Sequence, residues 1–287
     1  MIPLSVEPAR HPWFPVSTCG DSCLGPRGTK RVALLVDAVV VGRRLCRLAA
    51  VVCWIVGMLV ADEAVARLRH RPRRALRARA SGPLLAALGI RVVVDDRRRD
   101  PRATGLIVAN HISFLDVLAL ALVSSAHVVA KSDVIDMPVV AGIARRFGVI
   151  AVDRRTLRGL PAAVGGVCAR LAADSSVIVF PEGTTFCGRT GGEFRPAFFQ
   201  AAIDAAVPVL PVRLSFLGPD GHAATDPSFI GDDSPLDTLR RVLRARGLTV
   251  VVRLEPAEAP GTDRRELARR CERVLSSAES DIDCSLI

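Results

Sequence analysis

A histidine and an aspartate five residues apart are the first residues in this sequence that could do chemistry together. His111 and Asp116 follow an apolar run at 106–109, which predicts a short buried strand. They precede a Leu- and Ala-rich run at 117–123, which predicts a helix. Five residues turn a regular helix by about 500°, so the two side chains can meet only if His111 lies in the turn and Asp116 in the first helical turn. Such strand-to-helix turns commonly hold functional side chains in α/β folds.

Ser113 supports this placement, because a serine at the N-cap with an acidic residue three positions on is a signature of a helix start. The partial positive charge of a helix N-terminus favours a neutral imidazole, and a neutral imidazole beside a carboxylate can accept a proton from a hydroxyl. The alternative is that Asp116 only caps the helix and that His111 is an ordinary loop histidine. Asp116 could also do both.

Composition limits the class of protein. The 287 residues suit one large domain or a domain with an appendage. Half of the residues are hydrophobic, the mean hydropathy is +0.33, and 39 Lys and Arg against 29 Asp and Glu give a net charge of +10. A basic and apolar chain suggests nucleic acid or an anionic membrane surface as partner. Without tyrosine, and with two tryptophans, the basic stretches lack aromatic residues for base stacking, so no nucleic-acid partner is expected.

The eight cysteines give little sign of a metal site. The close pair is Cys19 and Cys23, with His11 nearby, and no second ligand pair accompanies it. No metal and no cofactor are therefore expected, and scattered thiols fit a reducing cytosolic setting.

The N-terminal third divides into a leader and a membrane-anchoring segment. Residues 1–31 lack periodicity and a secretory signal, and are expected to be a mobile leader. Within the helical segment 32–80, two apolar runs at 32–41 and 48–61 flank three arginines. The second run would span about 21 Å as a helix, against about 30 Å of hydrocarbon. A pair of helices dipping into one leaflet is expected, and a buried helix of the catalytic domain is the alternative.

Seven arginines follow the apolar runs. Beside a hydrophobic anchor they favour attraction to anionic lipid, and a solvated helix face is the alternative. These arginines are Arg67, Arg69, Arg71, Arg73, Arg74, Arg77 and Arg79.

The remainder of the chain is predicted to be an α/β catalytic domain at 81–256, followed by a C-terminal helix and tail at 257–287. Strands and helices alternate, which indicates a layered sheet flanked by helices. The expected strands are 91–94, 106–109, 127–130, 149–152, 177–180, 207–214 and 249–254, and the expected helices are 83–88, 117–123, 138–147, 160–173, 198–206 and 264–278.

Polar clusters follow four of the expected strands, at 110–116, 131–133, 153–155 and 181–185. If those strands are parallel, the clusters meet at the carboxyl edge of the sheet. Lys131, Arg154 and Arg155 would suit an anionic ligand, Gly183 permits close backbone approach, and the two threonines that follow it offer hydroxyl donors. Taken singly, the arginines are more often surface charges, and the turn is more often an ordinary one.

Four ordered motifs resemble the glycerolipid acyltransferase family, typified by 1-acylglycerol-3-phosphate acyltransferases. Asn110-His111 with Asp116 is similar to its Asn-His-x4-Asp signature. The later blocks are Val149-Ile-Ala-Val-Asp-Arg154, Phe180-Pro-Glu-Gly-Thr184 and Val207-Pro-Val-Leu-Pro-Val212. The resemblance covers about 81–214 and includes the position of the N-terminal membrane helices. It implies a glycerol-3-phosphate acyltransferase-like fold.

The resemblance implies acyl transfer from acyl-CoA or acyl carrier protein to a lysophospholipid hydroxyl, with phosphatidic acid as the expected product, at the cytoplasmic face of the cell membrane. His111 would be the general base and Asp116 its orienting partner. No Gly-x-Ser-x-Gly or Gly-x-Cys-x-Gly elbow occurs, so direct attack on the thioester is expected. The expected substrate-binding residues are Asn110, Lys131, Arg154, Glu182, Gly183, Thr184, Thr185 and Pro211, the last on the acyl-donor side.

Two positions depart from the family pattern. Thr185 stands where many members have arginine, which removes a phosphate-binding cation and makes another lysolipid, such as lyso-ornithine lipid, an alternative acceptor. The stretch 193–197 resembles a Phe-Lys-x-Gly segment, with Arg195 in place of lysine. A catalytically idle lipid-binding protein and a hydrolase are the rival classes.

Overall fold

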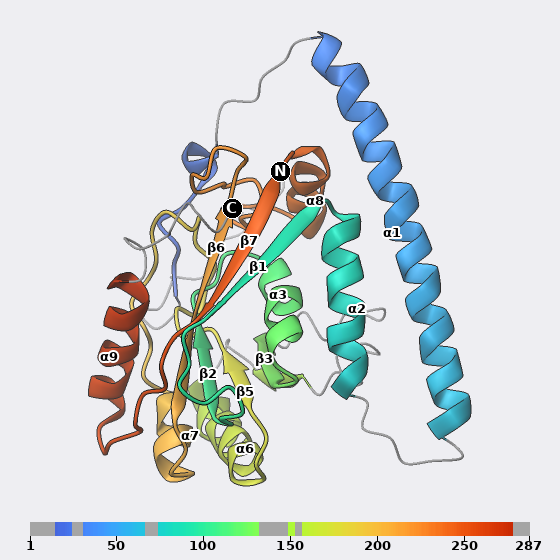
Figure 1. Cartoon of the computed structure of the whole chain (residues 1–287). Helices are drawn as coiled ribbons and strands as arrows, with labels where there is room; N and C mark the ends of the chain where they lie inside the picture. Colours follow the sequence, from blue (N-terminus) through green and yellow to red (C-terminus); the bar gives the residue numbers. More distant parts are fainter. Residues whose placement is uncertain (1–14, 25–30, 67–73, 132–148, 153–156, 278–287) are drawn as a thin grey trace, which may run out of the picture.

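A seven-stranded sheet is the centre of the fold. The structure is a computed structural model that describes residues 15–24, 31–66, 74–131, 149–152 and 157–277 (Figure 1). The strand order is β1-β7-β6-β2-β5-β3-β4. The strands are β1 Ile90–Asp96, β2 Leu106–Ala109, β3 His127–Lys131, β4 Ile150–Val152, β5 Val177–Val179, β6 Val209–Leu217 and β7 Leu248–Leu254.

Strands β2 to β6 run parallel to one another, and β7 with its parallel neighbour β1 runs the opposite way, because β6 and β7 pair antiparallel. The four strands that precede the polar clusters, β2 to β5, therefore share one direction. Their carboxyl ends therefore lie at one edge of the sheet, which is the arrangement that the polar clusters need in order to meet.

Helices cover both faces of the sheet. On one face α2, α3 and α8 pack on Ile107 and Ala109 of β2, and on the other α6, α7 and α9 pack on Leu106 and Val108. Successive side chains of a strand point to opposite faces, so an uninterrupted apolar strand such as β2 serves both cores. The helices are α1 Arg31–Ala66, α2 Arg74–Ala87, α3 Leu115–Val123, α6 Leu160–Ala172, α7 Phe199–Asp204, α8 Pro235–Arg244 and α9 Arg264–Ser277, with 3-10 turns η1 Asp21–Cys23 and η2 Leu157–Gly159.

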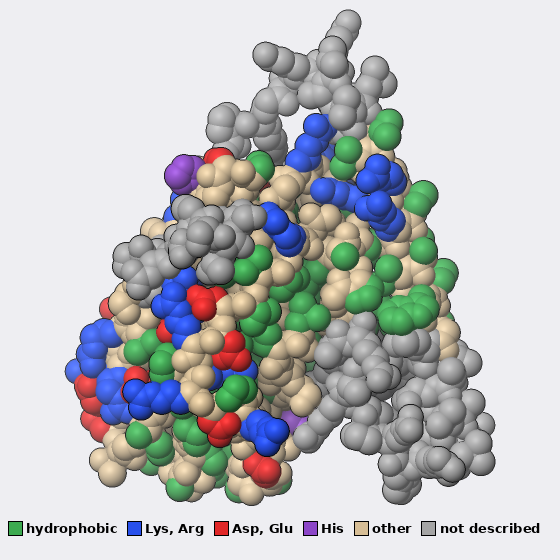
Figure 2. Space-filling view, viewed as in Figure 1, with side chains coloured by type: hydrophobic (Ala, Val, Ile, Leu, Met, Phe, Trp, Pro, Cys, Tyr) green, Lys and Arg blue, Asp and Glu red, His purple; other side chains and the backbone are tan. Residues whose placement is uncertain are grey.

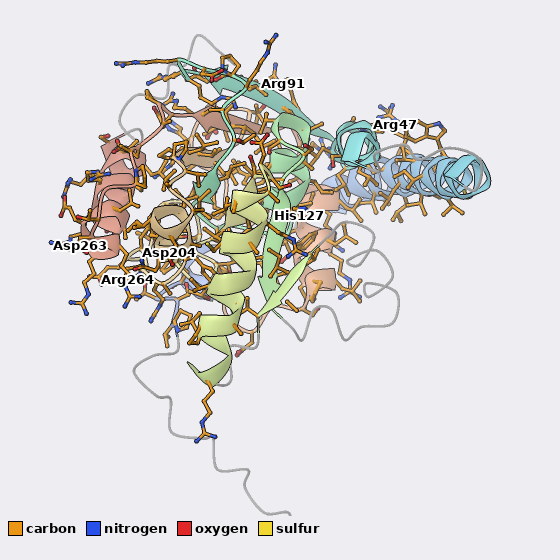
Figure 3. The ribbon with its side chains drawn as sticks, turned by 90° about the horizontal axis from the view of Figure 1, so that it is seen from below. Arg47, Arg91, His127, Asp204, Asp263 and Arg264 are labelled. Carbon is orange, nitrogen blue, oxygen red and sulfur yellow. The ribbon has the colours of Figure 1, made fainter. Side chains whose placement is uncertain are left out.

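The N-terminal segment forms one long helix rather than the expected pair. Helix α1 has 36 residues and packs on α2 and α8 at the side of the domain opposite α9 (Figures 1 and 3). Arg44 allows the helix to continue, because its guanidinium turns inward and donates hydrogen bonds to the carbonyls of Val242 and Leu243, each at 3.0 Å. Arg47 stays exposed (Figure 3). Among the described residues, no helix has the length and sustained hydropathy needed to cross a bilayer.

Several expectations lie where little or nothing is described. The helix expected at 138–147 and the arginines of 153–155 fall outside the described residues, as do the side chains of the seven arginines from Arg67 to Arg79. Part of the expected mobile leader, residues 15–24, packs against the domain, and Cys19 is buried there.

Candidate active site

His111 and Asp116 meet at the carboxyl end of β2, as their spacing predicted. Nδ1 of His111 lies 2.8 Å from Oδ2 of Asp116, and the aspartate side chain is fully buried. The same oxygen accepts hydrogen bonds from the backbone N–H groups of Ile112 at 2.7 Å and Ser113 at 2.9 Å. Because this oxygen is an acceptor, the hydrogen between the pair belongs to Nδ1, which leaves the lone pair of Nε2 to act as a base.

The expected role of Ser113 is wrong. Phe114 occupies the N-cap of α3 without a side-chain hydrogen bond, and the buried Ser113 hydroxyl has no partner among the described residues. Asp116, in the first turn, instead accepts the N–H of Ser113. Helix α3 begins at Leu115, two residues before the expected run at 117–123. The carboxylate of Asp116 therefore holds both the imidazole and the backbone that leads into the helix.

Two residues that follow β5 fix His111 from its other sides. The Phe180 ring stacks on the imidazole with centroids 4.0 Å apart and planes 17° apart. The backbone N–H of His111 donates to Oε2 of Glu182 at 2.6 Å, and the N–H of Gly192 donates to Oε1 at 3.0 Å. The His111 backbone, its ring face and its Nδ1 are thus all held, as a base that must point in one direction requires.

Glu182 is almost entirely buried, at 4% exposure. Burial raises its pKa to about 7, although the two N–H donors act in the opposite direction. The sequence predicted that Glu182 binds substrate. That role stays a prediction, since Glu182 lines the pocket described below. Both of its oxygens accept hydrogen bonds from the protein, which makes it a brace between the His111 backbone and the loop at Gly192.

Asn110 and Pro211 belong to the sheet. The Asn110 side chain donates to the carbonyl of Leu214 at 3.0 Å and accepts from its N–H at 2.8 Å, which extends the β2–β6 ladder beyond the end of β2. Pro211 is buried inside β6 opposite Val108. Asn110 therefore holds the catalytic loop against β6, and it also lines the pocket described below.

The Glu-Gly-Thr turn is closely surrounded. Gly183 has a φ of +75°, and a Cβ there would come within 2.9 Å of Pro15 Cγ and 3.6 Å of Arg195 Cδ. Thr184 is half-buried in the same turn. The Thr185 hydroxyl donates to the carbonyl of Phe229. Position 183 therefore requires glycine, both for the positive φ and because a side chain would not fit. Arg195 lies beside the same turn.

Lys131 ends β3, but its side chain is not among those described, and Arg154 lies outside the described residues. Their expected roles stay predictions.

Comparison with known proteins gives the family. The Acyltransferase family matches residues 91–215. The lyso-ornithine lipid O-acyltransferase of Pseudomonas aeruginosa is 33% identical over 197 residues, which are 68% of this chain and 74% of that protein. The 1-acyl-sn-glycerol-3-phosphate acyltransferase of Neisseria gonorrhoeae is 30% identical over 214 residues, 73% of this chain and 81% of its own. This chain belongs to the acyltransferase family.

A solved structure agrees on the fold. The crystal structure of the 1-acyl-sn-glycerophosphate acyltransferase PlsC from Thermotoga maritima superposes with a TM-score of 0.63 at 20% identity, covering 88% of this chain and 98% of that one. The layered α/β fold is thereby confirmed, and the two relatives above confirm the family resemblance inferred from the four motifs.

Sequence reasoning did not foresee some parts of this acyltransferase site. A pocket of about 200 Å³ beside His111 and Glu182 extends to Arg213 of β6 and to the end of α9. Arg213 donates to the carbonyl of Leu275 at 2.8 Å. Arg213 directly follows the fourth motif and Phe180 opens the third, so both positions carried a signal. The contribution of α9 carried no such signal in the sequence, because it depends on a helix far along the chain that folds back onto the pocket.

Proposed function

We propose that this acyltransferase moves an acyl chain from a thioester donor, acyl-CoA or acyl carrier protein, to the free hydroxyl of a lysolipid. The first candidate acceptor is 1-acylglycerol-3-phosphate, with phosphatidic acid as product. The single observation that carries the proposal is the 2.8 Å contact between Nδ1 of His111 and buried Asp116, which prepares Nε2 to accept a proton.

The chemistry needs no covalent enzyme intermediate. Nε2 of His111 takes the proton of the acceptor hydroxyl as its oxygen attacks the thioester carbonyl carbon. Asp116 stabilises the imidazolium that forms. When the tetrahedral intermediate collapses, the C–S bond breaks, and the imidazolium returns the proton to the leaving thiolate. The N–H of Gly183 already donates to the carbonyl of Phe180, so the Thr184 hydroxyl is the donor of this turn that we assign to the oxyanion.

A cation beside the turn suits an acidic headgroup. Arg195 is half-buried and its Cδ lies 3.6 Å from the position of a Cβ on Gly183. A guanidinium there can bind a phosphate bidentately. Arg154, by the family resemblance, is a second candidate for this role.

Lyso-ornithine lipid is the second candidate acceptor. Thr185 replaces the arginine of many members, and its hydroxyl is bonded to the Phe229 carbonyl. This position therefore contributes no cation to the acceptor site. The similarity to the P. aeruginosa enzyme named for lyso-ornithine lipid points in the same direction.

The outward face of α1 supports a membrane surface as the working environment. Arg44 and Leu48 lie on the face of α1 that packs on the domain. Elsewhere on its surface α1 exposes the large apolar residues Val39, Leu45, Val52, Trp54 and Val56, and hydrophobic side chains are seen along the outer edge of the helix in Figure 2. Exposed apolar side chains along one helix are costly in water and are favourable at a lipid interface. We place the protein at the cytoplasmic face of an anionic membrane, where the basic stretch from Arg67 to Arg79 would add electrostatic attraction.

An acceptor panel tests the proposal. The purified full chain is incubated with oleoyl-CoA, or with oleoyl-acyl carrier protein, and with separate lysolipids, and the products are resolved by mass. We expect an O-acylated product from 1-acylglycerol-3-phosphate, and the variant R195A should raise the KM for this acceptor about tenfold while R240A, on exposed α8 surface, should not. Product from lyso-ornithine lipid alone would select the second candidate. Release of free fatty acid with no acylated lysolipid would contradict acyl transfer.

A further inference from the structure

Three cysteine sulfurs from two distant segments come together beside the active-site turn. Cys19 and Cys23 lie in the packed leader segment 15–24, and Cys187 lies five residues after Glu182. Their sulfur atoms all lie within 4.8 Å of one another. Sequence spacing gave no sign of this group, because Cys187 is 164 residues beyond Cys23.

The surroundings of two of the sulfurs, those of Cys19 and Cys187, suit thiolates. Cys19 and Cys187 are buried in a small apolar cluster with Phe186 and Ile230, separate from the two main cores. The N–H of Cys187 donates to Sγ of Cys19 at 3.3 Å, and the Thr190 hydroxyl lies 3.5 Å from Sγ of Cys19 and 3.7 Å from Sγ of Cys187. N–H and O–H groups directed at sulfur stabilise its negative charge.

Local turns bring the sulfurs into a compact triangle. The 3-10 turn η1 closes on the N–H of Cys23, which donates to the carbonyl of Gly20 at 2.9 Å, so that Cys23 turns back toward Cys19. A zinc ion bound tetrahedrally at about 2.3 Å holds its sulfur ligands about 3.8 Å apart, well within the observed spacing. A disulfide would use two of the three sulfurs and leave the third without a role.

We propose that Cys19, Cys23 and Cys187 bind one thiophilic divalent metal ion, zinc by preference, as three thiolates. The three thiols release their protons to solvent as the ion binds, and the fourth tetrahedral position takes a ligand that is not one of these cysteines. No oxidant or reductant is involved.

The ion would link the leader segment 15–24 to the loop that carries Cys187. Pro15 of the leader covers Gly183, and the loop carrying Cys187 is joined to the catalytic segment by Phe186 N–H donating to the carbonyl of His111 at 2.8 Å. The Ser228 hydroxyl also donates to the carbonyl of Cys187 at 3.0 Å. The metal acts on the shape of the acceptor side of the site and takes no part in the acyl-transfer step.

Metal content of the full-length protein tests the proposal independently of turnover. After expression in zinc-supplemented medium and dialysis, we expect about one zinc ion per chain, and loss of nearly all of it in C19S, C23S and C187S. The matched control is C168S, whose cysteine is half-buried in α6 away from the cluster, and it should keep its zinc. Cobalt loaded into wild type in place of zinc should give the visible and near-ultraviolet bands of a tetrahedral thiolate site, a readout that does not require any variant to fold.

Two results would overturn the proposal. One is a wild-type protein that carries no zinc and shows no thiolate-to-cobalt band on titration. The other is a disulfide between two of the three cysteines, found by mass spectrometry in protein purified without air, which would mark a redox pair. The failure of either test leaves the acyl-transfer proposal standing, because transfer is measured by the lipid product.

Discussion

One oxygen of Asp116 performs two tasks at the active site. Its Oδ2 holds the segment before α3 through the N–H groups of Ile112 and Ser113 and also holds Nδ1 of His111. A fully buried carboxylate with three donors on one atom fixes the imidazole tautomer and orientation together. The orientation of the base is therefore coupled to the start of the helix.

Substitutions of Asp116 and Ser113 distinguish the residue that orients His111 from its neighbour at the start of α3. D116N should lower kcat/KM about 10²- to 10⁴-fold, because the amide can present a donor to Nδ1 and favour the wrong tautomer. S113A should leave turnover and melting temperature close to wild type, since the Ser113 hydroxyl has no partner among the described residues. Steady-state kinetics and thermal unfolding of both variants make the comparison. A large loss of turnover in S113A would refute the assignment of the helix start to Asp116.

Glu182 predicts a pH dependence of stability. Burial raises its folded-state pKa to about 7, above the ordinary value of 4.5, so the folded protein binds more protons than the unfolded chain between these two values. The stabilising contribution is therefore present below about pH 4.5 and is lost as the pH rises through 7, a change on the order of 3 kcal/mol. We expect E182Q to lack this decline. Denaturant unfolding of both proteins from pH 5 to 8 measures it, and parallel curves would contradict the raised pKa.

At the residue scale the sequence predicted which groups meet but not how each is used. The spacing of His111 and Asp116 allowed the two to meet at a helix start, and the family resemblance made them the expected catalytic pair. The ladder role of Asn110 and the brace role of Glu182 depend on Leu214 and Gly192, which are brought near only by the folded sheet and loop. Whether a polar side chain binds substrate or the protein backbone depends on partners that are distant in the sequence and close in the folded structure.

At the scale of elements, Arg44 joins α1 to the catalytic domain. Its guanidinium reaches three carbonyls at the end of α8, those of Val242, Leu243 and Ala245. A Cβ at Gly89 would lie 2.3 Å from Nη2 of Arg44, so that glycine leaves room for the side chain. A cation is also favoured at a helix C-terminus by the helix dipole.

We expect R44A to lower the free energy of unfolding by about 2 kcal/mol, because it removes charge-assisted hydrogen bonds and leaves helix carbonyls without donors. R47A, an exposed arginine one turn further along α1, should change it by less than about 0.5 kcal/mol. Chemical denaturation followed by circular dichroism compares the two. Equal effects would show that Arg44 does not fasten α1.

Strands and helices with strong apolar patterns were predicted well. β2 has the expected bounds, and β3, β4, α6 and α9 agree to within a residue at each end. Helix α8 was not predicted, although Ser234 and Asp237 form a capping box at its start that the sequence contained. The single helix α1 could not be foreseen, because the charge of Arg44 is accommodated by a partner about 200 residues further on.

At the scale of the whole molecule, α1 leaves several large apolar side chains exposed (Figure 2). The double variant V52E/V56E should reduce binding to vesicles containing anionic lipid at least about tenfold, because it replaces two of these side chains with charges. V94E is the matched control, since Val94 is comparably exposed on β1. Sedimentation with vesicles measures the bound fraction. If V52E/V56E sediments like wild type, the membrane-facing role of α1 is wrong.

The order of the sheet explains what else the sequence could not supply. Alternating strands and helices predicted the layers, whereas the shared direction of β2 to β5 entered only as a condition for the polar clusters to meet. The antiparallel pairing of β6 with β7, and the insertion of β7 between β1 and β6, depend on pairings between distant segments. The same holds for Cys187, which reaches the leader only through the folded loop.

His111, as the proposed general base, is the residue on which acyl transfer depends most. The most direct measurement is the rate of acylated lysolipid formation from oleoyl-CoA in wild type and in H111A, with folding checked by circular dichroism. We predict that H111A folds normally and that its kcat/KM falls about 10³-fold. A folded H111A enzyme with near-normal turnover would contradict the account.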